Sequence, residues 1–294
     1  MSSARPASVL VFDSGVGGLS VLQHIQQQLP ALMTHYVMDD AWCPYGERDQ
    51  SELVSRIVSV TESAIEACQP DALIVACNTA STLALSQLRN TLSIPVVGVV
   101  PALKPAAEVG NSGAIVLLAT SATVNGDYVA SLWKEFGEGK SLVTMACPEL
   151  VVLAESKLSG ESLKLATLRL WRDRLQEQLR ELEVASVSAF VLGCTHFPLL
   201  RDELMEAWDK PALWLDSGAA VARRVAVVLQ DDQRFTSTLI DAHVKTDPEP
   251  HKGSWWRTDS HPCRKREQTM ADYGLSAAGC LTIEVSVNSD GTTQ

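Results

Sequence analysis

The sequence predicts an α/β fold with two similar lobes, mainly parallel sheets flanked by helices, and an active site in the cleft between the lobes. Short runs rich in Val, Ile and Leu alternate with longer amphipathic stretches from Ser8 to about Gln230, which is typical of parallel strands joined by crossover helices. Similar motifs, such as Cys43-Pro44 and Cys147-Pro148, recur about one domain length apart. The chain has 294 residues, 46% of them hydrophobic, which is enough for two such cores.

Short apolar runs give the expected strands in order. They are Ser8–Phe12, His35–Met38, Ala72–Ala76, Val96–Val99, Ala114–Leu118, Leu142–Ala146, Ala189–Leu192 and Ala212–Leu215. Helical spacing of apolar residues predicts helices at Glu52–Cys68 and Gly160–Leu182, the second with Trp171 in the core. The last strand ends in Asp216-Ser217-Gly218, which is similar to Asp13-Ser14-Gly15 after the first strand. We therefore expect the last strand to return to the first lobe.

These patterns divide the chain into three parts. Residues 8–100 together with 213–230 form the expected first lobe, residues 101–212 the second, and residues 231–294 a C-terminal extension. In this extension, polar residues, prolines and histidines dominate Thr246–Glu267, and a weak strand pattern returns at Leu281–Val287. We interpret the extension as a peripheral tail and assign it no chemistry.

Charge and cysteine content exclude several classes of protein. The net charge of −11 argues against nucleic acid or an anionic membrane as a partner. The first residues lack the apolar stretch of a signal peptide, and no apolar segment is long enough to span a bilayer. An odd number of cysteines without regular spacing fits a reducing compartment. Without Cys-x-x-Cys or His-x-x-x-His spacing, we expect a cytoplasmic protein that holds no metal.

Two cysteines stand out because each follows an apolar run at once and precedes polar residues. Cys77 follows Ala72–Ala76 and precedes Asn78 and Thr79, and Cys194 ends a similar run. Open α/β folds bind ligands at this carboxyl edge of the sheet, where a helix N-terminus can lower the pKa of a thiol. One buried cysteine is usually a packing residue. Two in equivalent positions predict chemistry on two faces of one small molecule.

Polar groups at neighbouring strand ends complete the predicted site. Asp13 opens the turn Asp13-Ser14-Gly15-Val16-Gly17-Gly18, where glycines let backbone N–H groups approach an anion, and its carboxylate could exchange a proton with the first thiol. His196 stands two residues after Cys194 and could handle the proton of the second thiol. Glu155, on the helix expected after Cys147-Pro148, could polarise that histidine.

The remaining candidates are a loop and several isolated residues. Tyr45-Gly46-Glu47-Arg48 is either a substrate lid that sets specificity or a simple Pro-Gly turn. The other cysteines and histidines lack a comparable setting, and we interpret them as packing or incidental. They are Cys43, Cys68, Cys147, Cys263, Cys280, His24, His35, His243, His251 and His261.

As a set, the motifs resemble the glutamate racemases, a family of the cofactor-independent aspartate/glutamate racemase superfamily. The resemblance covers about Ser8–Leu229, with the motifs in the family's order. The matching segments are Phe12-Asp13-Ser14-Gly15-Val16-Gly17-Gly18, Pro44-Tyr45-Gly46-Glu47, Ala76-Cys77-Asn78-Thr79-Ala80, Ile94-Pro95-Val96-Val97-Gly98-Val99, Ala119-Thr120-Ser121-Ala122-Thr123, Leu192-Gly193-Cys194-Thr195-His196 and Asp216-Ser217-Gly218.

This resemblance implies cofactor-free interconversion of L- and D-glutamate, which supplies D-glutamate for peptidoglycan, by a homodimer. It implies that Cys77 and Cys194 form the acid/base pair. Asp13 would assist the first thiol, and His196 and Glu155 the second. The implied substrate contacts are Asp13, Ser14, Tyr45, Gly46, Asn78, Thr79, Thr123, Thr195 and His196.

Other functions stay open at this point. The same scaffold could act on aspartate or another amino acid. A cysteine hydrolase could use Cys194 and His196, but it would leave Cys77 without a role. A non-catalytic binding protein could keep the cleft alone. A racemase needs both thiols, a hydrolase one, and a binding protein neither.

Overall fold

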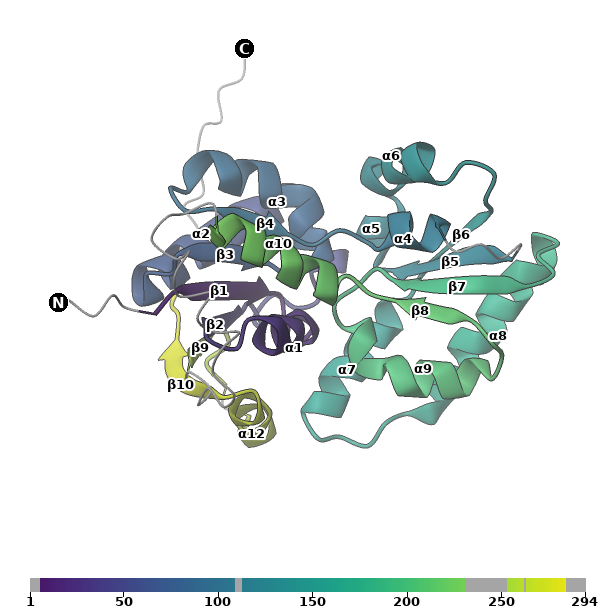
Figure 1. The fold of residues 1–294 in the computed structure, drawn as a ribbon. Helices are drawn as coiled ribbons and strands as arrows, with labels where there is room; N and C mark the ends of the chain where they lie inside the picture. Colours follow the sequence, from purple (N-terminus) through teal and green to yellow (C-terminus); the bar gives the residue numbers. More distant parts are fainter. Residues whose placement is uncertain (1–5, 109–112, 231–252, 262, 284–294) are drawn as a thin grey trace, which may run out of the picture.

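Two α/β lobes lie side by side in the computed structural model, which describes residues 6–108, 113–230, 253–261 and 263–283 (Figure 1). Each lobe is built on one sheet, and every strand pairing within the described residues is parallel. The first sheet has the order β10 (Leu275–Cys280), β9 (Gly253–Arg257), β2 (Met33–Met38), β1 (Ser8–Asp13), β3 (Ala72–Val75) and β4 (Val96–Gly98). The second has the order β6 (Leu142–Ala146), β5 (Ala114–Ala119), β7 (Val187–Leu192) and β8 (Leu213–Leu215). The predicted fold class is confirmed.

Helices cover both faces of the first sheet, which explains its continuous apolar runs. Along β1, Val9 and Val11 pack into one hydrophobic cluster, whereas Leu10 and Phe12 pack into another on the opposite face. Successive side chains of a strand point to opposite faces, so a strand covered on both sides must be apolar throughout. The covering helices are α1 (Leu19–Gln28), α10 (Gly218–Gln230) and α12 (Arg264–Asp272) on the first face, and α2 (Gln50–Cys68) and α3 (Asn78–Thr91) on the other.

The second lobe repeats this layering with different helices. One face carries α7 (Pro148–Leu158), α8 (Leu165–Glu181) and α9 (Arg201–Trp208), and the other carries α4 (Leu103–Ala107) and α6 (Asp127–Phe136). Short helical turns at the lobe junction are η1 (Tyr45–Glu47), α5 (Ser121–Val124) and η2 (Phe197–Leu200). Trp171 is fully buried, as predicted. Helix α8 begins at Leu165, later than predicted: Gly160 has a φ of +74° and ends the turn after α7, and residues 161–164 are not helical.

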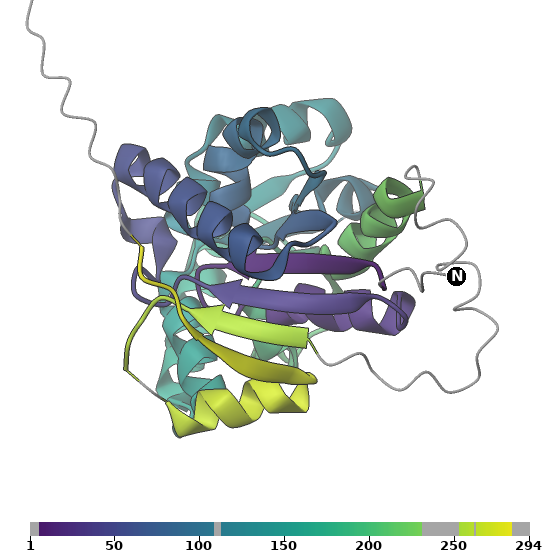
Figure 2. The same cartoon turned by 90° about the vertical axis from the view of Figure 1, so that its left-hand side faces the viewer.

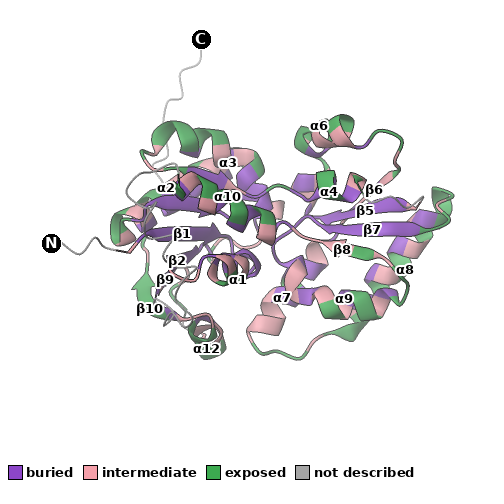
Figure 3. Ribbon diagram, in the orientation of Figure 1, coloured by how far each residue is buried: buried purple, intermediate pink, exposed green. Residues whose placement is uncertain are grey.

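Burial follows these layers. The central strands β1, β2, β3, β5 and β7 are almost entirely buried, whereas the edge strands β8 and β10 and the outer sides of the helices are largely exposed or half-buried (Figure 3). Among the described residues, no helix combines the length and the apolar character needed to cross a membrane.

The prediction that Ala212–Leu215 completes the first lobe is wrong. Strand β8 pairs with β7 in the second sheet, and Trp214 stacks on Phe190 of β7 with ring centroids 4.2 Å apart. The chain returns to the first lobe only with α10, which packs against α1. The Asp-Ser-Gly motif therefore marks the end of a strand without showing which sheet the strand joins.

The prediction of a peripheral C-terminal tail is wrong for residues 253–261 and 263–280. Strands β9 and β10 extend the first sheet beyond β2 (Figure 2). Trp255 and Trp256 pack into the hydrophobic clusters on opposite faces of that sheet. Their burial was not predicted because the neighbouring residues in the sequence are polar. Of the predicted strand Leu281–Val287, residues 281–283 are not in a strand and 284–287 lie outside the described residues.

Candidate active site

The carboxyl ends of strands from both lobes meet at one junction. Asp13, at the end of β1, accepts a hydrogen bond on Oδ2 from Thr195 Oγ1 at 2.9 Å. The backbone N–H of Val16 donates to Glu155 Oε1 at 2.8 Å, and Ser20 Oγ donates to the Thr195 carbonyl at 2.9 Å. The predicted residues of the two lobes are therefore in direct contact.

The first thiol lies on the first-lobe side of this junction. Cys77 directly precedes α3, is 6% exposed, and has its Sγ 3.9 Å from Ser14 Oγ. Burial, followed by the nearby Asp13 carboxylate, raises the pKa of the Cys77 thiol, although the backbone N–H of Ala80 acts in the opposite direction. The expected lowering of this pKa by the helix N-terminus is therefore wrong, because loss of hydration outweighs the helix.

The second thiol is connected to an imidazole and a carboxylate. Cys194 Sγ lies 3.8 Å from His196 Nδ1, and His196 Nε2 lies 2.8 Å from Glu155 Oε1. Burial opposes the charged imidazole, but bonds to Cys194, Cys43 and Glu155 outweigh it and raise the pKa of His196 well above its usual value. Burial also opposes the charged form of Glu155, yet contacts led by His196 lower the pKa of this carboxyl. The pair is therefore an imidazolium and a carboxylate at neutral pH.

We expect the Glu155→Gln substitution to lower the pKa of His196, since the neutral amide no longer favours the imidazolium. The raised pKa contributes stability fully below the unfolded histidine value of about 6.5, and this contribution is lost as pH rises through the folded pKa. Imidazole ¹⁵N shifts, followed from neutral to alkaline pH, measure the change. Glu149→Gln, on the same helix but paired with Arg174, is the matched control. An unchanged His196 titration in Glu155→Gln would contradict the ion pair.

The glycine-rich turn after β1 allows this close approach between the lobes. A Cβ atom at Gly15 would overlap the Glu155 carboxylate, and one at Gly17 would overlap the His196 ring. The turn was predicted to bring backbone N–H groups to an anion, and the Val16 N–H does contact the Glu155 carboxylate. The anion bound by this turn is therefore the carboxylate of Glu155 and not a ligand.

The predicted substrate contacts gather beside Cys77. Hydroxyl groups link Thr79 to Thr120 and Thr120 to Thr123, each at 3.1 Å, and Ser14 adds a further hydroxyl near the thiol. Asn78 Oδ1 is buried and has no hydrogen-bond partner among the described residues. This oxygen is an acceptor to which a substrate N–H group could donate. Thr120 was not among the predicted contacts, although it belongs to a motif noted in the sequence.

Tyr45 and Gly46 lie at the edge of this group. The Tyr45 hydroxyl donates to Asp39 Oδ2 at 2.7 Å, so it is already engaged within the first lobe. Gly46 faces Thr120 closely, with 3.0 Å between an added Cβ and the threonine Cβ. A cavity of about 250 Å³ is lined by Tyr45, Gly46 and Ser121, among others. That this segment is a substrate lid stays a prediction.

The sequence did not reveal two further residues at the junction, Cys43 and Arg266. Cys43 Sγ lies 3.9 Å from Glu155 Oε1, and its contact with His196 shows that it is not incidental. The donor atoms of Cys43, Glu155 and His196 lie within 4.8 Å of one another and are of the types that bind zinc. The only sequence signal was the Cys-Pro repeat. Arg266 contacts Glu155 from the C-terminal segment, for which there was no signal.

The fold and the site define the class of this protein: an α/β protein of two lobes that carries one thiol from each lobe at their junction. The chain belongs to the Asp/Glu/hydantoin racemase family, whose model matches residues 9–225.

Particular relatives are similar over most of the chain. The glutamate racemase of Shewanella oneidensis (strain MR-1) is 46% identical over 285 residues, covering 96% of this chain and 98% of that protein. Among solved structures, Escherichia coli glutamate racemase in complex with L-glutamate and the activator UDP-MurNAc-ala has a TM-score of 0.78 at 36% identity, covering 95% and 99% of the two chains. Glutamate racemase isoform RacE1 of Bacillus anthracis has a TM-score of 0.72 at 26% identity, covering 95% and 98%.

Proposed function

We propose that this chain is a glutamate racemase, which removes the α-proton of glutamate on one face and returns a proton on the other. The observation that carries the proposal is the pair of buried thiols, one from each lobe, at the junction where Thr195 of the second lobe donates to Asp13 of the first. The substrate is inferred from the relatives, which are glutamate racemases, and from the E. coli structure that contains L-glutamate.

Each thiol has its own proton partner in the proposed mechanism. Asp13 accepts the proton of Cys77, and the resulting thiolate removes the substrate α-proton. The Cys194 thiol then protonates the opposite face, and the His196 imidazolium, held by Glu155, returns a proton to Cys194. The reverse reaction uses the same groups with their roles exchanged. Burial raises the pKa of Cys77, so the positive charge of the substrate ammonium must help to form its thiolate.

Hydrogen-bond donors replace a cofactor in stabilising the carbanion. An amino-acid α-proton is very weakly acidic, so exclusion of water and fixed donors near the substrate carboxylate must lower the barrier. We assign the substrate contacts to Asp13, Ser14, Tyr45, Gly46, Asn78, Thr79, Thr123, Thr195 and His196, with Tyr45 acting through groups other than its hydroxyl, which donates to Asp39. In the cell, the product would supply D-glutamate for peptidoglycan in the cytoplasm, from a homodimer without a nucleic-acid or membrane partner.

We expect purified protein in deuterium oxide to racemise L-glutamate while one deuterium enters at Cα. Circular dichroism follows the loss of optical activity, and NMR follows the exchange. L-Aspartate in the same assay is the control for substrate choice. Exchange of aspartate but not glutamate would contradict the substrate assignment, and exchange of neither would contradict racemisation.

A further inference from the structure

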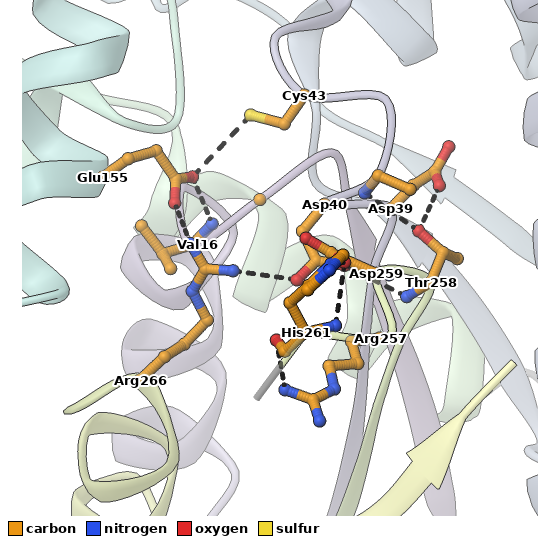
Figure 4. Close-up of polar contacts among 12 residues, drawn as sticks. Val16, Asp39, Asp40, Cys43, Glu155, Arg257, Thr258, Asp259, His261 and Arg266 are labelled. Carbon is orange, nitrogen blue, oxygen red and sulfur yellow. Dashed lines mark hydrogen bonds and ion pairs between the residues drawn. The ribbon is translucent and has the colours of Figure 1, made fainter. Parts of the chain in front are cut away.

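Arg266, in the C-terminal segment, joins two carboxylates that belong to different lobes (Figure 4). Its Nη1 donates to Asp40 Oδ2 at 2.8 Å, and its Nη2 donates to Glu155 Oε2 at 3.3 Å. Asp40 follows β2 in the first lobe, whereas Glu155 is on α7 in the second. The arginine side chain is 18% exposed and that of Asp40 is 4% exposed, so water screens these contacts only weakly.

The two oxygens of Glu155 have different partners. Oε1 receives the Val16 N–H and contacts His196 Nε2, both at 2.8 Å, whereas Oε2 receives the guanidinium. The carboxylate thus has partners on both oxygens, and the guanidinium contact restricts its rotation further.

The first-lobe partner of Arg266, Asp40, is held by the residues that directly follow β9. Asp40 Oδ1 accepts the backbone N–H groups of Thr258 at 3.1 Å and Asp259 at 2.8 Å, which come directly after β9 (Figure 4). These two contacts hold the Asp40 carboxylate in place independently of its contact with Arg266.

Helix α12, which carries Arg266, is fastened to both lobes. Met270 is fully buried in the core of the first lobe, and Thr269 Oγ1 donates to the Leu158 carbonyl at the end of α7 at 3.0 Å. The helix therefore presents the guanidinium at a fixed position between Asp40 and Glu155.

We propose that Arg266 is a positioning residue for the second acid/base group of the reaction. By holding Asp40 and Glu155 Oε2 together, it keeps Glu155 Oε1 on His196 and thereby keeps His196 aligned with Cys194. The proposal rests on the proposed racemase function. It makes residues 253–261 and 263–280, which lie beyond the residues matched by the family model, part of the active-site structure.

The test compares Arg266→Met with Arg264→Met, an exposed position on the same helix. Steady-state kinetics are measured in both directions, with α-protonated and α-deuterated L- and D-glutamate. We expect Arg266→Met to lower kcat about 10- to 100-fold with little change in KM, by analogy with residues that orient metal-binding histidines. Arg266→Lys is expected to recover only part of this loss, because an ammonium group cannot span both carboxylates as a planar guanidinium does.

The isotope effects distinguish positioning from general damage. If only the Cys194 step slows, the primary isotope effect rises for the enantiomer that Cys194 deprotonates and falls for the other. Arg266→Met should therefore shift both values in the same sense as Glu155→Gln and in the opposite sense to Asp13→Asn, which affects the Cys77 step. Wild-type kinetics in Arg266→Met, or a loss of activity without this asymmetry, would overturn the proposal.

A second readout needs no turnover. The proton between His196 Nε2 and Glu155 is expected to give a downfield ¹H resonance in the wild type and in Arg264→Met, and to shift or vanish in Arg266→Met. If the wild type does not racemise glutamate, the proposed function fails, and this resonance alone decides whether Arg266 positions the pair. An unchanged resonance in Arg266→Met would show that it does not.

Discussion

Replacement of Cys77 or Cys194 by alanine is expected to lower glutamate racemisation by about 10³-fold or more while the protein stays folded. A positioned acid or base typically contributes about 10²- to 10⁴-fold, and each thiol serves one face of the substrate. The remaining thiol can still exchange the α-proton of the enantiomer that it faces. We therefore expect Cys77→Ala and Cys194→Ala each to exchange one enantiomer with deuterium oxide, and a different one in each variant.

Cys147→Ala is the matched control for this experiment. Like Cys77, Cys147 is a buried cysteine that directly precedes a helix, but it packs in the core of the second lobe. Its replacement should leave racemisation largely intact. Full racemisation in either Cys77→Ala or Cys194→Ala would contradict the two-thiol mechanism. Thiol-dependent hydrolysis that needs Cys194 but not Cys77 would instead favour a hydrolase.

The largest expected loss of stability follows from Arg56→Met. Arg56 Nη2 and Nε donate to Asp39 at 2.7 and 3.0 Å, and the two side chains are 7% and 0% exposed. Asp39 also accepts the hydroxyl groups of Tyr45 and Thr258, so one carboxylate ties α2 to η1 and to the segment after β9. Removal of one partner from a buried ion pair leaves the other charge without compensation. The free energy of unfolding is therefore expected to fall by about 3–5 kcal/mol.

Arg48→Met provides the control for this loss. Both guanidinium groups lie over the Trp42 ring, at 5.5 Å for Arg48 and 5.4 Å for Arg56, but Arg48 is exposed. Its substitution should change the free energy of unfolding by no more than about 0.5 kcal/mol. Urea unfolding, followed by circular dichroism, measures both variants. Exposed ion pairs contribute less than about 1 kcal/mol to the free energy of unfolding. A decrease of that size in Arg56→Met would therefore contradict a stabilising role for the buried pair.

The apolar runs were sufficient to predict the two sheets and most of their strands. Strands buried on both faces are apolar over most of their length, and this constraint is visible locally, as in Val9–Phe12 of β1 and in all of β5. For the same reason, the polar residues directly after such runs were recognisable as a site. Asp13, Cys77, Cys194 and His196 each stand at or just after the carboxyl end of a strand, and the parallel arrangement brings them to one junction.

Features that depend on contacts between distant segments became visible only in the tertiary structure. Strand β8 joins the second sheet, where Trp214 stacks on Phe190, and β9 and β10 join the first sheet although their surroundings in the sequence are polar. The raised pKa of Cys77 follows from burial, which depends on how the lobes pack. Arg266 and Glu155 are 111 residues apart in sequence. The local sequence predicts which face of an element is buried, whereas the partner of a buried charge is decided by the packing of the whole chain.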